Sequence, residues 1–204
     1  MVGEALAPYR DQVVIATKCG IRMENGRQVV DANLSGIRRS IEGSLQRLKT
    51  DHVDLYYLHR IDPNVPIEEV AGLMQELMEE GKILHWGLSE AGIPTIRRAH
   101  AVCPLTAVES EYSMWWRQPE HELFPVLEEL GIGFIPFAPL GKGFLTGKFQ
   151  ADGKVPSAKG GSVYPRFTPE ALSANQKLVE YIQSLADEKK CTYAQIALAL
   201  VMAK

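Results

Sequence analysis

VDLYYLH at Val53–His59 and VVIATK at Val13–Lys18 are the two stretches that decide the fold of this chain. Each is a short run of β-branched, aliphatic or aromatic residues with polar or turn residues at its borders, which is typical of a buried strand. Each run ends in a residue that can exchange a proton, and a helical pattern follows. Repeated strand–helix proteins place catalytic groups at the carboxyl ends of their strands, so two such ends predict one shared site.

Similar strand-like runs recur along the chain with helical patterns between them. This alternation predicts parallel strands joined by right-handed crossovers, which fits both an open doubly wound sheet and a closed barrel. A spacing of about 22–40 residues per unit suits a barrel. The predicted strands are 13–18, 53–59, 83–88, 105–110 and 132–137.

Local signals mark the ends of the predicted helices. Asn33 is the expected N-cap of the first full helix, which carries an apolar stripe through Ile37 and Ile41. Pro66 at the first position and Gly81 after the last turn bound the second helix. The predicted helices cover 33–48, 66–81, about 93–102, about 119–130, about 168–189 and 192–203, the last one capped by Thr192.

Composition limits the class of protein. The chain has 204 residues, of which 46% are hydrophobic and 23% charged, with a net charge of -3. These values are ordinary for a globular protein and argue against a nucleic-acid-binding or anionic-membrane surface. The three cysteines are scattered and lack the spacing of metal ligands, so we expect neither a disulfide framework nor a metal site. This cysteine usage favours a reducing, cytoplasmic setting. No segment has the pattern of a signal peptide or membrane span.

The two ends of the chain are expected to lie inside structural elements. Residues 2–9 have the pattern of a helix tail without a cap, and 192–203 that of a helix still facing a core. Residues 139–167, rich in Gly, Pro, Lys and Ser, are predicted to form one long loop. Five strands cannot close an eight-stranded barrel. We therefore expect residues 1–204 to be a single, partial domain.

Lys18 and His59 are the candidate catalytic residues. A lysine at a strand end is commonly only solvated, but it can also lower the pKa of a neighbouring acid or hold a cofactor. A lone histidine is more often structural, yet at a barrel's carboxyl face it is suited to proton transfer or to hydrogen bonding a carbonyl oxygen.

Polar and aromatic residues follow the next two predicted strands. Ser89 and Glu90 could cap the helix that follows, or could hydrogen bond a ligand that carries an amide. Glu109 and Tyr112 close the fourth strand, and the tyrosine ring could roof the barrel or stack on a planar ring. The tryptophan pair 115–116 could wall an apolar substrate pocket or serve only in packing.

The segment 139–148, PLGKGFLTGK, follows the fifth predicted strand. Its glycines would let backbone amides approach phosphate oxygens, and its lysines supply positive charge. The segment matches neither a Walker loop nor a Rossmann fingerprint, and by itself a Gly/Lys loop is weak evidence for phosphate binding. Its predicted position at the same face as the other candidate groups strengthens that interpretation.

These motifs, in this order, resemble those of the aldo-keto reductases, (β/α)₈ TIM barrels that reduce carbonyl groups with NADPH. The resemblance covers essentially the whole chain. It implies that 15–18 carries the catalytic lysine, Lys18, and that 54–59 carries the catalytic histidine, His59. It also implies a cofactor site formed by Ser89, Glu90, Glu109, Tyr112, Pro139, Leu140, Gly141, Gly143 and Lys148, and no metal.

The chain departs from the family pattern in three ways. Glu90 stands where many members have Asn, and Glu109 where many have Gln. An ionised carboxylate cannot donate a hydrogen bond, so contacts to the nicotinamide would change at both positions. The family's catalytic tyrosine and its partner aspartate belong to strand–helix units upstream of the matched region. Tyr9 does not lie in that motif.

The resemblance implies an NADP-dependent oxidoreductase that converts aldehydes or ketones to alcohols, inactive as this truncated chain. The expected partner is a small carbonyl substrate, with no nucleic acid and no membrane. One alternative is a non-catalytic NADP-binding or regulatory protein on the same scaffold. Another is an unrelated barrel enzyme, such as a lyase that forms a Schiff base on Lys18. Specificity in barrels lies in the loops, so the substrate stays open.

Overall fold

The computed structural model describes residues 1–148 and 165–204, which divide into two compact units. Unit 1 comprises 1–110 and 123–135, and unit 2 comprises 111–122 and 136–204. The predicted long loop 139–167 includes 149–164, which lie outside the described residues. Each unit is described below by itself.

One sheet organises the chain. Its five strands follow the order β1-β4-β5-β6-β7, and β1, β4, β5 and β6 pair parallel with their neighbours. Neighbouring strands are thus consecutive in the alternation, as in a barrel wall, and the prediction of about five parallel strands with flanking helices is confirmed. The strands are β1 (Ala16–Cys19), β4 (Val53–Leu58), β5 (Ile83–Ser89), β6 (Ala107–Glu111) and β7 (Gly133–Phe137).

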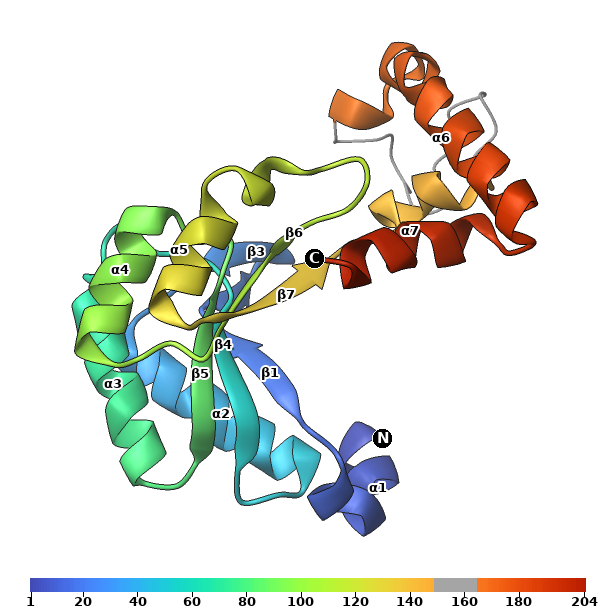
Figure 1. Ribbon diagram of the computed structural model, residues 1–204. Coiled ribbons are helices and arrows are strands. Elements are labelled where there is room, and N and C mark those ends of the chain that lie inside the picture. The colour runs from blue at the N-terminus through green and yellow to red at the C-terminus, as the bar shows by residue number, and fades with distance from the viewer. Residues whose placement is uncertain (149–164) are drawn as a thin grey trace. The chain divides into compact units, whose positions relative to one another are not determined.

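Helices α2 (Leu34–Leu48), α3 (Ile67–Glu79) and α4 (Ile93–Val102) lie along one side of this sheet (Figure 1). The side chain of Asn33 accepts from the N–H groups of Ser35 and Gly36, which confirms the predicted cap. Pro66 is the N-cap rather than the first helical residue, because its ψ of 131° is still extended. Trp86, Met74 and other apolar side chains at or near 0% exposure fill the space between helices and sheet.

The chain begins with α1 (Val2–Leu6) and the 3₁₀ helix η1 (Ala7–Gln12). The predicted strand at 13–18 starts later, at Ala16, because the N–H of Ile15 binds the Asp54 carboxylate and Val14 is 79% exposed. A second small sheet, β2 (Ile21–Glu24) with β3 (Arg27–Val30), was not expected. Asn25-Gly26, both with positive φ, forms its turn, and this pair is a known hairpin signal.

The remaining elements are largely as expected from the sequence. The predicted helix at about 119–130 splits into η2 (Gln118–Glu120) and α5 (Leu123–Leu130). In unit 2, α6 (Pro169–Lys189) and α7 (Tyr193–Met202) follow the predicted ranges, and Thr192 forms a capping box. Two 3₁₀ helices, η3 (Gly141–Thr146) and η4 (Pro165–Phe167), lie inside the stretch that was predicted to be one loop.

Two features fix the strands that carry the candidate site. The carboxylate of Asp54 accepts from the Ile15 N–H at 2.7 Å and pairs with Arg10 at 3.0 Å, which ties the start of β1 to β4. On the other side of β4, a Cβ at Gly87 would lie 2.4 Å from the Ala107 carbonyl oxygen and 2.6 Å from the Tyr57 ring. Only glycine fits there, so β5 can pass close beneath the Tyr57 side chain.

We expect Gly87→Ala to destabilise the chain by about 1–3 kcal/mol, because the added methyl group meets backbone as well as the ring. The matched control is Gly72→Ala in α3, where a Cβ would meet nothing within 4 Å. That change should be neutral or stabilise by up to about 1 kcal/mol, because alanine is the better helix former. Urea unfolding of both variants measures the difference, and equal midpoints would contradict the close approach at β5.

Asp54→Asn should destabilise the chain by about 1–3 kcal/mol at pH 7, because the Ile15 and Arg10 partners lose a charged acceptor. Burial raises the pKa of Asp54, but the bonds from Ile15 and Arg10 outweigh it and hold the pKa below the ordinary 3.8. A lowered folded pKa gives stability that is present above about pH 4 and lost as the pH falls through the folded value.

Urea midpoints of wild type and Asp54→Asn should therefore converge when the pH is lowered from 5 to 3. The exposed residue Asp11 supplies the control, because Asp11→Asn should change stability by less than about 0.5 kcal/mol at either pH. A wild-type advantage over Asp54→Asn that stays constant down to pH 3 would show that the ionised carboxylate contributes nothing.

Candidate functional site

The candidate residues of unit 1 lie together at one end of the sheet, where the carboxyl ends of four parallel strands meet. In the parallel register Lys18 lies opposite Tyr57, Tyr57 opposite Gly87, and Ser89 opposite Glu109. The N–H of His59 donates to the Cys19 carbonyl at 2.9 Å, which extends the β1–β4 pairing by one residue. Parallel pairing alone thus aligns the residues that the sequence placed at separate strand ends.

Lys18 and Glu109 form an ion pair across the inner face of the sheet. The distance from Lys18 Nζ to Glu109 Oε2 is 2.9 Å, and the side chains are 32% and 14% exposed. Two strands, β4 and β5, lie between β1 and β6. In a flat sheet the outer two strands would be about 14 Å apart. The contact therefore requires both a curved sheet and two long side chains.

The ammonium group of Lys18 also lies 5.5 Å from the centre of the Tyr57 ring. The Tyr57 hydroxyl is buried and has no hydrogen-bond partner among the described residues. Burial, and then the charge of Glu109, raises the pKa of Tyr57 to about 12. This phenol is thus a neutral hydrogen-bonding group at neutral pH. No role is predicted for Tyr57 from the sequence, although its position two residues before His59 places it on the same face of the strand.

His59 is partly buried at the same edge. Burial lowers the pKa of His59 below its ordinary 6.5, and the positive charges of Arg60 and Lys18 lower it further. Glu109 acts in the opposite direction. The imidazole is therefore neutral at pH 7, and a neutral imidazole can donate one hydrogen bond and accept another.

Arg60 joins the site through Ser89. The Arg60 guanidinium donates to the Ser89 hydroxyl at 3.3 Å and to the His59 carbonyl at 2.7 Å, and Ser89 is only 1% exposed. No role is predicted for Arg60 from the sequence. Its signal was its place directly after His59 at a strand end.

Glu90 lies next to this group but is exposed. Its N–H donates to the Glu109 carbonyl at 2.9 Å, and its φ of 55° is in the left-handed region. The reading of Ser89 and Glu90 as a helix cap is wrong, because α4 begins at Ile93 with Gly92 as its N-cap. Glu90 instead turns the chain away from β5.

Tyr112, Trp115 and their neighbours belong to unit 2. Tyr112 is 1% exposed, and its hydroxyl donates to Glu120 at 2.5 Å. Burial, followed by this bond, raises the pKa of Tyr112 to about 12. Trp115 stacks on Phe144 with ring centres 4.2 Å apart, and its indole N–H donates to Asn175 at 2.9 Å. These contacts support the packing role for Trp115.

Arg166 links this aromatic group to β6. Its guanidinium donates two bonds of 2.7 Å to Glu111 and lies 5.6 and 5.5 Å from the rings of Trp115 and Trp116. Trp116 is 42% exposed.

The predicted phosphate-binding loop, Pro139 to Lys148, also lies in unit 2. Gly141, Lys142 and Gly143 have φ values of 57°, 54° and 98°, which non-glycine residues rarely adopt. The turn is closed by N–H bonds from Gly143 and Leu145 to the Leu140 carbonyl. Lys142 and Lys148 are exposed. The N–H groups of Gly141, Gly143 and Leu145 thus donate to main-chain carbonyl oxygens, and positive charge from the two lysines is what the loop offers an anion.

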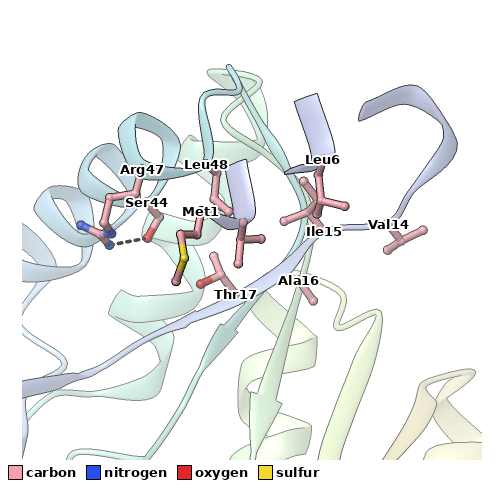
Figure 2. A pocket seen from close by; sticks show the side chains of 10 residues that line it. Met1, Leu6, Val14, Ile15, Ala16, Thr17, Ser44, Arg47 and Leu48 are labelled. Atoms are coloured by element: carbon pink, nitrogen blue, oxygen red, sulfur yellow. Dashed lines mark hydrogen bonds between the residues drawn. The ribbon is translucent and has the colours of Figure 1, made fainter. Parts of the chain in front are cut away.

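A separate hollow of about 590 Å³ lies beside the first half of β1 (Figure 2). Its lining is mostly apolar. Leu6 of α1, Leu48 of α2 and Met1, which precedes α1, contribute to it. The polar groups labelled there are Thr17, Ser44 and Arg47, and Arg47 donates to Ser44 at 3.3 Å. None of the candidate residues lines this hollow, so it is not the predicted site.

The described residues contain neither a cluster of metal ligands nor a helix that could span a membrane. Residues 1–148 and 165–204 hold no group of three or more His, Cys, Asp or Glu side chains that could bind a metal ion. No described helix is long and apolar enough to cross a membrane.

Comparisons with known proteins agree on one family. A family model described as "Aldo/keto reductase family" matches residues 1–204. A curated protein from Glycine max, "Probable aldo-keto reductase 1", is 44% identical over an alignment 207 positions long, which covers 99% of this chain and 59% of that protein. The chain thus spans about three fifths of this relative.

Solved structures give the same result. A glycerol dehydrogenase from Gluconobacter oxydans matches with a TM-score of 0.86 at 27% identity, over 95% of this chain and 61% of that one. An aldo/keto reductase from Klebsiella pneumoniae in complex with NADP and acetate matches with a TM-score of 0.69 at 25% identity, over 98% of this chain and 59% of that one.

The surroundings of His59 lead to a prediction about its protonation. We expect its midpoint in a ¹³C–¹H NMR titration to lie below 6.5, because burial and two nearby cations disfavour the imidazolium. The variant His59→Gln assigns the resonance. A midpoint at or above 6.5 would mean that Glu109 outweighs the other three influences.

Proposed function

Because the chain belongs to the aldo/keto reductase family, we propose that it carries part of a site that reduces aldehydes or ketones to alcohols, with NADPH as the hydride donor. One observation carries this proposal: Lys18, His59 and Glu109 converge at the carboxyl edge of the sheet from three different strands. The chain spans about three fifths of the relatives it matches, so the activity of a whole protein is part of the proposal.

The chain's own residues would act on the carbonyl oxygen. A neutral His59 can donate a hydrogen bond to that oxygen and orient the carbonyl group. The Lys18 ammonium supplies a positive charge near the place where an alkoxide would develop. Tyr57 does not replace the family's acid, because burial and Glu109 raise its pKa to about 12.

NADPH would supply the hydride when bound. In unit 1 the nicotinamide end would be held by Ser89, Glu90 and Glu109, which stand at neighbouring strand ends. The two carboxylates would accept from the carboxamide NH₂ and could not donate to its oxygen. Arg60, whose guanidinium already donates to Ser89, could supply the donor for that oxygen.

In unit 2 the loop with Pro139, Leu140, Gly141, Gly143 and Lys148 would bind the phosphates, and its left-handed turn and exposed lysines fit that role. The ring of Tyr112 would stack on the nicotinamide. In this structure Tyr112 is 1% exposed and its hydroxyl donates to Glu120, so stacking would require the ring to be uncovered.

We further propose that the 204 residues alone bind the cofactor without turnover, as one cytoplasmic domain. The family's tyrosine and its partner aspartate have no counterpart in the sequence. The same observation favours a second candidate function, a non-catalytic NADP-binding or regulatory protein. The three free cysteines, two of them buried, support a reducing compartment.

Fluorescence titration with NADPH tests the proposal. We expect saturable binding that is weakened about tenfold in Lys148→Ala, because a charged partner of the phosphates is lost. Lys177→Ala removes an exposed lysine of α6 and should leave binding unchanged. Equal effects of the two changes would contradict a phosphate site in the loop.

An aldehyde panel tests turnover in the same samples. We expect no NADPH oxidation above the background rate, because the family's catalytic tyrosine and its partner aspartate have no counterpart in the sequence. Robust oxidation that His59→Ala abolishes would overturn the proposal of inactivity and would establish catalysis by the 204 residues.

A further inference from the structure

Glu109 stands out among the site residues because of what it contacts. Its carboxylate reaches from β6 across β5 and β4 to the Lys18 ammonium on β1, at 2.9 Å. The carboxylate is the less exposed partner, at 14%. A solvated surface pair contributes little, but a partly desolvated pair inside a curved sheet restricts both side chains.

The chemistry of position 109 matters here. A glutamine would be nearly isosteric and could accept one bond from Lys18, but it would carry no charge. A glutamate adds a full negative charge next to a full positive one. Within the described residues, the carboxylate at the end of β6 lies 2.9 Å from the Lys18 ammonium and balances its charge.

We propose that Glu109 is a positioning residue for the site: it fixes the Lys18 ammonium over the Tyr57 ring and balances its charge beside His59. This inference rests on the proposed function for its meaning in carbonyl reduction. It assigns Glu109 a role within the protein itself, in addition to any contact with the cofactor.

The charged groups that face His59 determine how its protonation would change if Glu109 were lost. They are Lys18 from β1, Arg60 from the end of β4, and Glu109 from β6. Two are cations, and Glu109 supplies the negative charge that opposes them. Without that charge the imidazolium would meet two cations alone, so His59 would become harder to protonate.

The test compares four proteins: wild type, Glu109→Gln, Glu109→Asp and the control Glu79→Gln. Glu79 ends α3 and is exposed, so this control makes the same change in net charge away from the site. Thermal unfolding first establishes that each variant folds. The free chain is then used without cofactor, which keeps the measurement independent of turnover.

Two readouts separate charge from position. The first is the His59 midpoint in ¹³C–¹H NMR, which should fall by about 0.5 unit in Glu109→Gln, or about threefold in the protonation constant. The second is the rate of reductive methylation of Lys18, followed by peptide mass spectrometry. It should rise at least about threefold in Glu109→Gln, because the amine is no longer held.

The aspartate variant keeps the charge but shortens the side chain by one methylene group. We expect its His59 midpoint to stay near the wild-type value while Lys18 is methylated faster. Glu79→Gln should change neither readout. The proposal is overturned if Glu109→Gln leaves both the His59 midpoint and the Lys18 rate as in wild type.

NADPH binding by wild type distinguishes this result from a failure of the proposed function. Binding absent in wild type, together with the expected changes in Glu109→Gln, would reject the function and keep the Lys18–Glu109 assignment. Binding present without those changes would keep the function and reject the positioning role.

Discussion

The curvature of the parallel sheet is the constraint on which the candidate site depends. Lys18 and Glu109 lie on strands separated by two others, and their 2.9 Å contact exists only because the sheet bends. Tyr57 fills the inner face between them, and β5 can pass the Tyr57 ring because position 87 has no Cβ. Gly87, the Tyr57 ring and the Lys18 ammonium thus lie in contact one after another along neighbouring strands.

The start of β1 is held by a different kind of interaction. Asp54 binds both the Ile15 N–H and Arg10, so the first residues of β1 are fixed to β4 by a charged side chain before regular pairing begins. This anchor lies at the opposite end of β1 from Lys18. In barrel enzymes the amino ends of the strands serve stability, and the Asp54 anchor lies at the amino end of β1.

Unit 2 contributes groups of another character. Its loop from Pro139 to Lys148 combines left-handed residues with exposed lysines, a combination suited to anions rather than to acid–base chemistry. Beside it, Trp115 is engaged by Phe144, Phe167 and Asn175. The contacts of Trp115 are thus those of a packing residue, and the loop is the part of unit 2 for which we propose ligand binding.

The sequence by itself determined the strand–helix alternation, the caps at Asn33 and Thr192, and the strand-end position of Lys18 and His59, because these depend on neighbouring residues. It also contained the Asn25-Gly26 signal, which is local and sufficient to indicate the β2–β3 hairpin. Only the tertiary structure decided that Glu109 pairs with Lys18, that Arg60 binds Ser89 and that the Tyr57 hydroxyl is buried. These contacts join residues far apart in the chain, and the bend of the sheet, which no local pattern encodes, brings Glu109 to Lys18.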